Sequence, residues 1–324
     1  MTRYLVTGGA GFIGSHLADR LLARGDEVLA LDDLSTGRSR NIAHLKETRG
    51  FRFRHGSILD APLVNGLVEE TDVVVHLAAA VGVKLIVERP LESLVTNIRG
   101  TETVLSAAAE NDRKVLVTST SEIYGKNTGL LSEDADRIIG SPLKARWSYS
   151  TAKAVDEILA NAYWRDRATP TIIVRMFNSV GPRQTGQYGM VVPRFVRQAL
   201  TGDDVTVYGD GGQRRCFCHV LDTVEALVGL LDHPNAVGGV FNVGAANEVT
   251  INGLAELVIE MSGSSSRIVR IPYDEAYEEG FEDMQRRVPD TTRIYDLIGW
   301  EAKRSLEDII RDVLAHERAS LPVV

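Results

Sequence analysis

The sequence predicts an α/β fold, with a doubly wound parallel sheet followed by a smaller mixed α/β C-terminal domain that binds substrate. Two observations support this prediction. In the first half, short β-branched runs such as RYLVTG and VVVHLAA alternate with helical patterns such as GSHLADRLLARG. Strands that are apolar on both faces and separated by helices form parallel sheets covered on both sides. The alternation changes after about residue 178, where GPRQTGQYG is rich in Gly, Pro and Gln.

The expected elements of the first domain follow one another without internal repeats. The strand-like runs are RYLVTG, EVLALDD, FRFRHGSI, VVVHLAA, KVLVTST and TIIVRMF. The helical patterns are GSHLADRLLARG, a segment near 92–110 and a segment that starts at Tyr149. One more helix and strand, within 217–243, are expected to return to the main sheet. We therefore divide the chain into two domains, residues 1–177 with 217–243, and residues 178–216 with 244–324.

The composition is that of an ordinary globular protein and excludes several classes of function. Of the 324 residues 44% are hydrophobic and 25% charged, and the net charge is −8. Acids and bases are interleaved, so no basic stripe is available to bind a nucleic acid. Cys216 and Cys218 are too few for a disulfide framework or a zinc site, and we expect no metal. Without a signal-peptide pattern or a membrane-spanning stretch, the expected protein is cytoplasmic and binds no membrane.

A glycine-rich turn follows the first expected strand and opens the first expected helix. VTGGAGFIGSHL sets Gly8, Gly11 and Gly14 at three-residue spacing. These glycines allow a tight turn and close approach to a pyrophosphate, and the helix N-terminus supplies N–H groups to the anion. Asp32 ends the second strand, 24 residues after Gly8. A carboxylate there accepts from both ribose hydroxyls of NAD and repels the extra phosphate of NADP. The pattern predicts a Rossmann-type sheet that binds NAD.

The segment YSTAK places Tyr149 four residues before Lys153, so both side chains project from one face of a helix. VTSTSEIYG ends an expected sheet strand, and strand ends in doubly wound folds open onto the ligand crevice. Thr120, in that segment, could hydrogen-bond a substrate hydroxyl. A nearby ammonium and a positively charged nicotinamide both favour the phenolate of a tyrosine. We therefore expect Tyr149 to take a proton from a sugar hydroxyl while a hydride leaves the same carbon.

Eight motifs occur in an order typical of one known family: GGAGFIGSHL, HLAA, NIRGT, TSTSEIYG, YSTAK, FNSVGPR, GGQRRCF and RVPDTTRIYDLIGW. Along essentially its whole length the chain resembles extended short-chain dehydrogenase/reductases that act on nucleotide sugars, both UDP-sugar 4-epimerases and UDP-glucuronate decarboxylases. In that family NAD stays bound and is regenerated in each turnover. The resemblance also implies a homodimer, formed through helices near 92–110 and 149–165.

The resemblance implies further residues of the cofactor site. Asn97 would support this site, and many relatives have an Asp at the end of the third strand that contacts the adenine. Here the sequence is HGSI, so Ser57 replaces that Asp and Ile58 would pack beside the ring. The remaining implied cofactor contacts are Phe12, Ile13, Asp33, Leu77, Ala78 and Ala79.

At the other end of the site the resemblance implies contacts with a UDP-sugar. Guanidinium groups suit a diphosphate because they can bind its oxygens in a bidentate manner. The implied contacts are Asn178, Arg215 and Arg287 with the diphosphate, Asp290 with a ribose, and Val192 and Tyr208 as walls of the uracil pocket.

Once a C4 ketone forms, epimerisation, dehydration and decarboxylation compete in this family. Ser121 stands where dehydratases carry an Asp, so dehydration is disfavoured. Glu122 resembles the decarboxylases, but relatives named 4-epimerases also carry a Glu there, and a structural role for it remains open. A 4-keto uronate is a β-keto acid that loses carbon dioxide readily.

A loop residue decides the sequence-based choice between the remaining reactions. Some uronate 4-epimerases carry an Arg where this chain has Thr185, so either the sugar is neutral or other groups hold its carboxylate. The candidates are Lys84, Arg146, and the Thr185 hydroxyl with backbone amides. A loosely held carboxylate would favour epimerisation. We therefore predict an isomerase that converts UDP-glucuronate to UDP-galacturonate, with UDP-glucose and UDP-galactose next. The alternatives are decarboxylation of UDP-glucuronate and a non-catalytic NAD-binding regulator.

Overall fold

A seven-stranded parallel sheet forms the centre of the computed structural model, which describes residues 1–80, 89–144, 147–186, 190–272, 275, 284 and 286–320. Its strand order is β12-β7-β5-β4-β1-β2-β3, and every neighbouring pair is parallel. The chain order reverses between β1 and β4, which is where a doubly wound sheet opens a crevice. The strands are β1 (Arg3–Thr7), β2 (Glu27–Asp32), β3 (Phe51–His55), β4 (Val73–His76), β5 (Lys114–Thr120), β7 (Thr171–Met176) and β12 (Val240–Val243).

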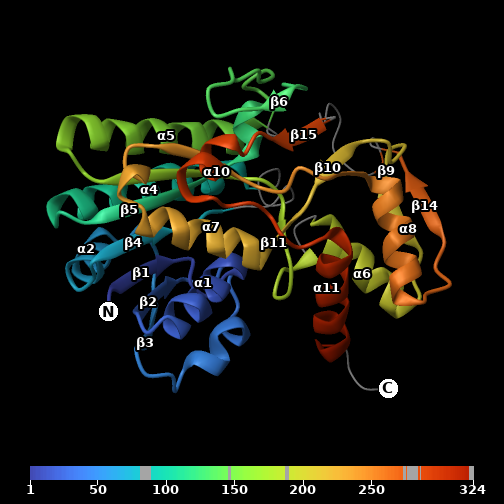
Figure 1. The fold of residues 1–324 in the computed structure, drawn as a ribbon, viewed down its shortest axis with the longest axis horizontal. Coiled ribbons are helices and arrows are strands. Elements are labelled where there is room, and N and C mark those ends of the chain that lie inside the picture. Colours follow the sequence, from blue (N-terminus) through green and yellow to red (C-terminus); the bar gives the residue numbers. More distant parts are fainter. Residues whose placement is uncertain are drawn as a thin grey trace.

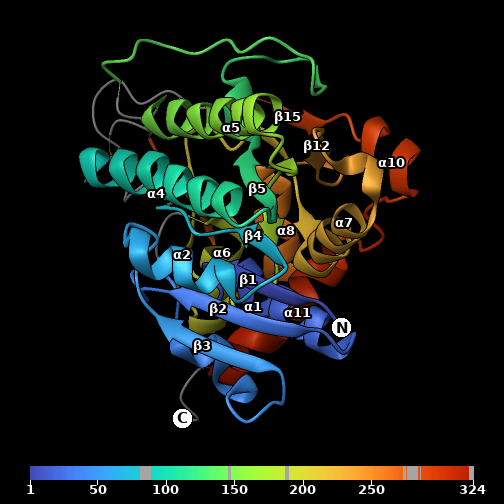
Figure 2. The same cartoon turned by 90° about the vertical axis from the view of Figure 1, so that its left-hand side faces the viewer.

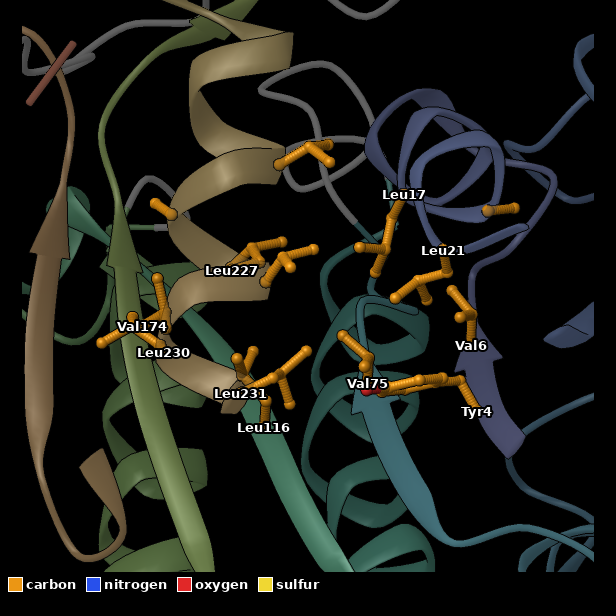
Figure 3. Close-up of a cluster of buried hydrophobic side chains, with 14 of the residues drawn as sticks. Tyr4, Val6, Leu17, Leu21, Val75, Leu116, Val174, Leu227, Leu230 and Leu231 are labelled. Carbon is orange, nitrogen blue, oxygen red and sulfur yellow. The ribbon is translucent and has the colours of Figure 1, made fainter. Parts of the chain in front are cut away.

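Helices cover both faces of this sheet, as Figures 1 and 2 show. Adjacent residues of a strand point to opposite faces, so β1 sends Val6 toward one helix layer and Leu5 toward the other. Figure 3 shows part of the first layer, in which Leu17 and Leu21 of α1 and Leu227 of α7 belong to the same buried cluster as Val6. The covering helices are α1 (Phe12–Ala23) and α7 (Val220–Asp232) on one face, and α2 (Ala61–Glu69), α4 (Pro90–Glu110) and α5 (Ser148–Arg167) on the other.

The second half of the chain builds smaller sheets beside the main one. One has the order β13-β10-β15-β6, and two further pairs are β11 with β8 and β14 with β9. Their bounds are β6 (Leu130–Leu131), β8 (Ser179–Val180), β9 (Val205–Tyr208), β10 (Arg214–Cys216), β11 (Cys218–His219), β13 (Glu248–Thr250), β14 (Ile268–Ile271) and β15 (Arg286–Pro289). The helices are α6 (Val191–Thr201), α8 (Ile251–Ser262), α10 (Thr292–Ile298) and α11 (Leu306–Ser320), with 3-10 turns η1 (Ser39–Leu45), η2 (Ser121–Tyr124) and η5 (Pro234–Ala236).

The fold class matches the prediction of a doubly wound parallel sheet. The strand and helix expected within 217–243 are α7 and β12, and β12 pairs with β7 of the main sheet. The two halves also exchange strands, because β6, from the first half of the chain, pairs with β15. The domain limits remain a prediction.

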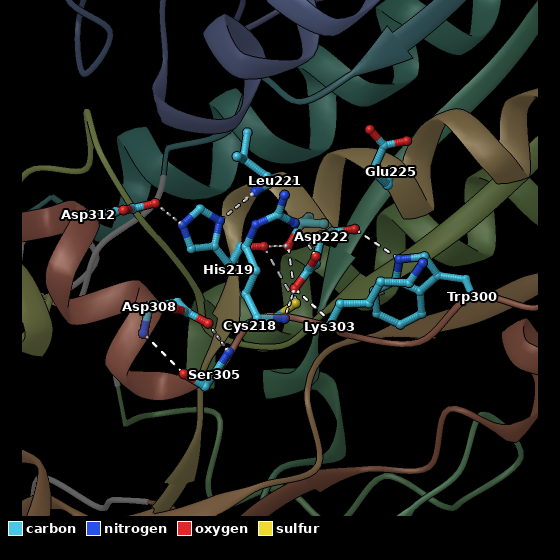
Figure 4. A network of polar contacts seen from close by, with 12 residues as sticks. Cys218, His219, Leu221, Asp222, Glu225, Trp300, Lys303, Ser305, Asp308 and Asp312 are labelled. Carbon is cyan, nitrogen blue, oxygen red and sulfur yellow. Dashed lines mark hydrogen bonds and ion pairs between the residues drawn. The ribbon is translucent and has the colours of Figure 1, made fainter.

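A polar network joins the last helix to α7 (Figure 4). His219 caps the start of α7 by accepting from the backbone N–H of Leu221, and its other ring nitrogen lies 3.1 Å from the Asp312 carboxylate of α11. The Asp222 carboxylate accepts from the backbone N–H groups of Lys303 and Arg304 at 3.1 and 2.9 Å. These bonds hold the C-terminal segment against the junction of the two halves.

Three findings bear on the remaining sequence predictions. Cys216 and Cys218 are free and buried, and burial raises the pKa of each thiol to about 12. Within the described residues, no group of three or more His, Cys, Asp or Glu side chains could hold a metal ion. Among the helices that the structure describes, none combines the length and apolar character needed to cross a membrane.

Candidate active site

A cavity of about 770 Å³ lies at the carboxyl ends of the main sheet and extends to the smaller half. Its wall includes residues at or just after the ends of β1, β2, β4, β5 and β7, as expected at the point where the strand order reverses. Residues of α6, β9 and β10 close the opposite side. The cavity therefore contains both the predicted cofactor region and the predicted substrate region.

The glycine turn fits the pyrophosphate of a dinucleotide. Gly8 has φ +71°, and a Cβ there would lie 2.9 Å from the backbone nitrogen of Ala78. A Cβ on Gly14 would lie 2.2 Å from the carbonyl oxygen of Gly8. Only glycines let α1 approach the turn this closely, which leaves its N-terminal N–H groups facing the cavity.

Asp32 ends β2 on the cavity wall and is fixed by the backbone. Its carboxylate accepts from the N–H of Ala10 at 3.0 Å and of Leu34 at 2.8 Å. Burial raises the pKa of Asp32, and these two hydrogen bonds oppose the rise. A Cβ on Gly37 would lie 2.6 Å from the same carboxylate, so a glycine at this position leaves it room. A carboxylate so oriented suits ribose hydroxyls.

The other predicted cofactor residues fall into two groups. Asn97 and Ser57 do not line the cavity. Asn97 instead fixes its wall, since its amide group accepts from Ala80 N at 2.8 Å and donates to Ala80 O at 3.2 Å. The Ser57 hydroxyl accepts a hydrogen bond from the N–H of Leu59, and this bond stabilises a local turn. The predicted residues that line the cavity are Gly8, Gly11, Phe12, Ile13, Gly14, Asp32, Asp33, Ile58, Leu77, Ala78 and Ala79.

The structure brings Thr120, Tyr149 and Lys153 together on the cavity wall. Thr120 ends β5 and caps η2 by accepting from the N–H of Glu122, while Tyr149 and Lys153 lie in the first turns of α5. Lys153 forms an ion pair with Asp156, at 2.6 Å from Nζ to Oδ2.

The pKa of the Tyr149 phenol is higher than we expected from the sequence. We expected the lysine ammonium to favour the phenolate. Burial instead raises the pKa of Tyr149 well above its usual value, the charges of Glu122 and Asp156 raise it further, and Arg287 opposes them. Burial is the largest cause, because a desolvated phenolate is unfavourable, so the chain's own groups keep the phenol protonated.

A second cluster adjoins this group and was not foreseen as a unit. Arg287 donates from Nη2 to the Ser121 hydroxyl at 2.6 Å, and its Nη1 lies 3.6 Å from Oε1 of Glu122. Strand β15 carries Arg287 beside Arg215 of β10, the register partner of Arg287. Arg287, Arg215 and Glu122 line the cavity, whereas Ser121 is fully buried behind it.

The remaining substrate predictions are placed as follows. Asn178, Val192 and Tyr208 line the cavity. Thr185 does not, and its hydroxyl accepts from Arg38 at 2.9 Å. Asp290 does not line it either and accepts from the N–H of Thr292 at the start of α10. Lys84 and Arg146 lie outside the described residues.

Two residues near the site were missed. Arg194 of α6 stacks on Tyr208, with its guanidinium carbon 4.1 Å from the ring centroid. No local sequence pattern predicts this contact, because α6 and β9 become neighbours only in the folded protein. Asp156 could have been found, since an acid three residues after Lys153 falls on the same face of the helix.

A family model described as the NAD dependent epimerase/dehydratase family matches residues 4–244. The chain belongs to this family. The match confirms the predicted resemblance and the NAD cofactor, and it supports an enzyme over the non-catalytic regulator.

Curated relatives and solved structures agree on the family and differ in the reaction that their names state. The chain is 42% identical, over 96% of both chains, to UDP-N-acetyl-alpha-D-glucosaminuronate decarboxylase of Bacillus cytotoxicus. It is 36% identical to UDP-glucuronic acid decarboxylase 1 of Arabidopsis thaliana, over 94% of this chain and 67% of the relative. A UDP-glucuronic acid 4-epimerase from Bacillus cereus, solved with UDP-glucuronic acid and NAD, superposes with a TM-score of 0.89 at 28% identity, covering 98% of this chain and 100% of that one.

These comparisons overturn the predicted 4-epimerase reaction. The relatives at 42% and 36% identity are decarboxylases, whereas the 4-epimerase structure shares 28%. The prediction had relied on the missing Arg at Thr185. Thr185 does not line the cavity, whereas Arg287 does, beside Ser121 and Glu122.

Proposed function

We propose that the protein is a lyase that decarboxylates a UDP-hexuronate of the glucuronate series after oxidation at C4. One observation carries the proposal: Arg287 and Glu122, with Ser121 buried behind them, line the same cavity as Thr120 and Tyr149. It offers a carboxylate-binding group beside the predicted oxidation site. The two decarboxylase relatives support this assignment.

Oxidation at C4 is the first task of the chain's own groups. When bound, NAD supplies the hydride acceptor. The positive charge of bound nicotinamide would favour loss of the phenol proton, and the resulting Tyr149 phenolate is placed to receive the proton of the C4 hydroxyl, which the Thr120 hydroxyl would orient. Because burial, Glu122 and Asp156 raise the pKa of Tyr149, the protonated phenol then remains a hydrogen-bond donor to the C4 oxygen.

Decarboxylation follows from the ketone. The C5–carboxyl bond of the β-keto acid breaks, carbon dioxide leaves, and the electron pair moves onto the C4 oxygen as an enolate. Donors aimed at that oxygen stabilise the developing charge, which is the role we assign to Tyr149 and Thr120. Protonation at C5 then yields the 4-keto pentose. Return of the hydride to C4, with the proton of Tyr149 going to the C4 oxygen, would give the UDP-pentose and restore oxidised NAD.

The Arg287 cluster suits a carboxylate that must be held and then lost. Arg287 already faces Glu122 at 3.6 Å, so a substrate carboxylate would meet a partly neutralised guanidinium. Too strong an ion pair with the ground state would oppose release of neutral carbon dioxide, because only interactions stronger in the transition state accelerate a reaction. We therefore assign Arg287 to the carboxylate rather than the diphosphate, and leave the diphosphate to Arg215.

In the test, the purified protein is incubated without added NAD, in separate reactions, with UDP-glucuronate, UDP-N-acetylglucosaminuronate and UDP-glucose. We expect carbon dioxide and a UDP-pentose from a uronate and no epimer from UDP-glucose. A six-carbon C4 epimer of the uronate, formed without carbon dioxide, would contradict the proposal.

A matched pair of variants separates the two arginines. Arg287→Lys keeps the charge but loses the fork that contacts Ser121, so we expect release of carbon dioxide to fall by about 100-fold. Reduction of the bound nicotinamide should fall much less. Arg215→Lys, on the neighbouring strand, should mainly raise the KM for every UDP-sugar. Equal losses of oxidation and decarboxylation in Arg287→Lys would remove its assigned role.

A further inference from the structure

The ion pair between Lys153 and Asp156 is buried behind the cavity. The two side chains are 3% and 0% exposed, and Nζ lies 2.6 Å from Oδ2. Asp156 does not line the cavity, so it reaches a substrate only through Lys153. A buried ion pair is stable only where further hydrogen bonds satisfy its remaining atoms.

Further bonds continue from Asp156 through three elements. The Thr101 hydroxyl, on α4, lies close enough to the Asp156 carboxylate to lower its pKa, while Oδ1 of Asp156 has no hydrogen-bond partner among the described residues. Thr101 Oγ1 lies 3.1 Å from Nε2 of His76, at the end of β4. His76 Nδ1 lies 2.8 Å from the hydroxyl of Thr7, at the end of β1. Thr7 accepts from the N–H of Ala78 at 3.2 Å, and Ala78 lines the dinucleotide part of the cavity.

The Asp156 carboxylate at one end of this series determines which atom donates in each hydrogen bond. A carboxylate only accepts, so a hydrogen bond between Thr101 and Asp156 would use the Thr101 proton, and the Thr101 oxygen would accept from Nε2–H of His76. Nδ1 then lacks a proton and accepts from the Thr7 hydroxyl. Burial and the charge of Lys153 lower the pKa of His76 to about 3, so the ring is neutral, as this arrangement requires. Thr7, Thr101 and His76 are each at most 1% exposed, so water does not compete.

We propose that Asp156, Thr101 and His76 are positioning residues, which together hold the Lys153 ammonium beside Tyr149 and tie it to the wall of the dinucleotide site. The proposal rests on the proposed function only for the oxidation step at Tyr149. The charged groups around that step are Lys153, Asp156, Glu122 and Arg287, with Glu157 acting on Asp156.

The kinetic test measures formation of the reduced nicotinamide in a single turnover, which does not depend on whether carbon dioxide is lost later. Asp156→Asn and Thr101→Val should each slow it by about 100-fold, whereas Thr101→Ser keeps the hydroxyl and most of the rate. Asp166→Asn, the same change at an exposed site of α5, is the control. Unchanged thermal unfolding and bound NAD in Thr101→Val would exclude a folding defect.

Whether Asp156→Asn lowers or raises the rate distinguishes a positioning role of Asp156 from a purely electrostatic one. The Asp156 carboxylate by itself raises the pKa of Tyr149. If it did nothing else, its removal would lower that pKa and keep or raise the rate at neutral pH. The proposal requires the rate to fall, with a greater loss at alkaline pH, where an unpaired buried lysine releases its proton. A retained rate, or equal rates in Thr101→Val and Thr101→Ser, would overturn it.

A second measurement needs no turnover and so remains decisive if the enzyme proves to act on another sugar. Nitrogen-15 NMR of the His76 ring in the NAD-bound protein should show a neutral imidazole protonated on Nε2 at neutral pH. A ring protonated on Nδ1, or on both nitrogens, would reverse or break the direction of the bonds and sink the proposal.

Discussion

At the scale of single residues, burial sets the charge of two histidines. His16 is 8% exposed, and its Nε2 lies 2.9 Å from the carbonyl oxygen of Pro182. Burial lowers the pKa of His16 to about 4, and that of His76 to about 3. Both rings are therefore neutral in the folded protein, whereas in the unfolded chain they titrate near the ordinary value of about 6.5.

This difference predicts a loss of stability in mild acid. As the pH falls from about 6.5 to about 4, the unfolded chain takes up protons that the folded protein does not, so the free energy of unfolding decreases. For His16 the decrease is roughly 3 kcal/mol. Urea unfolding across this range should show a smaller decrease for His16→Gln than for wild type. His44→Gln, at an exposed histidine, should leave this decrease in the free energy of unfolding unchanged. Equal decreases in both variants would contradict the assignment.

At the scale of elements, two helix glycines have opposite surroundings. Gly14 of α1 touches the glycine turn, where a Cβ would lie 2.2 Å from Gly8 O. Gly66 lies within α2 and is exposed, and a Cβ there would meet nothing within 4 Å. Gly14 is required because α1 approaches the glycine turn closely, whereas Gly66 only adds to the backbone entropy that is lost on folding.

We therefore expect opposite results from the same substitution. Gly66→Ala should raise the free energy of unfolding by roughly 0.5–1 kcal/mol and leave bound NAD unchanged. Gly14→Ala should lower the free energy of unfolding and release NAD, because α1 must move off the turn. Urea unfolding and the NAD content of the purified variants test both. An NAD-replete, fully stable Gly14→Ala variant would show that the contact is not needed.

At the scale of the whole molecule, α4 and α5 lie side by side over one face of the main sheet (Figure 2). Large apolar side chains remain outside, with Leu91 of α4 74% exposed and Ile158 of α5 64% exposed. The family resemblance implies a homodimer through these helices, which would cover such residues.

Ile158→Asp should therefore give a monomer that retains NAD, because a buried unpaired carboxylate opposes association. Light scattering across a range of concentrations would measure the mass. Leu143→Asp, at a loop residue that is 94% exposed, is the matched control and should keep the wild-type mass. A dimer that survives Ile158→Asp would place the interface elsewhere.

Local sequence patterns determined the fold class and the cofactor. Alternation of apolar runs with helical segments predicted the parallel sheet, and the glycine spacing with Asp32 predicted NAD, because both signals lie within short stretches of chain. Spacing along one helix likewise put Tyr149 and Lys153 on one face.

Contacts between distant segments were decided only by the tertiary structure. Arg287 reaches Ser121, 166 residues away, because β15 inserts between β10 and β6. His76, Thr101 and Asp156 meet through β4, α4 and α5, and Thr185 turns to Arg38 outside the cavity. The reaction assigned to the site depends on such pairings, and a linear pattern carries no information on which distant side chains will touch. The local motifs led to the right family, whereas the predicted reaction was corrected by the decarboxylase relatives.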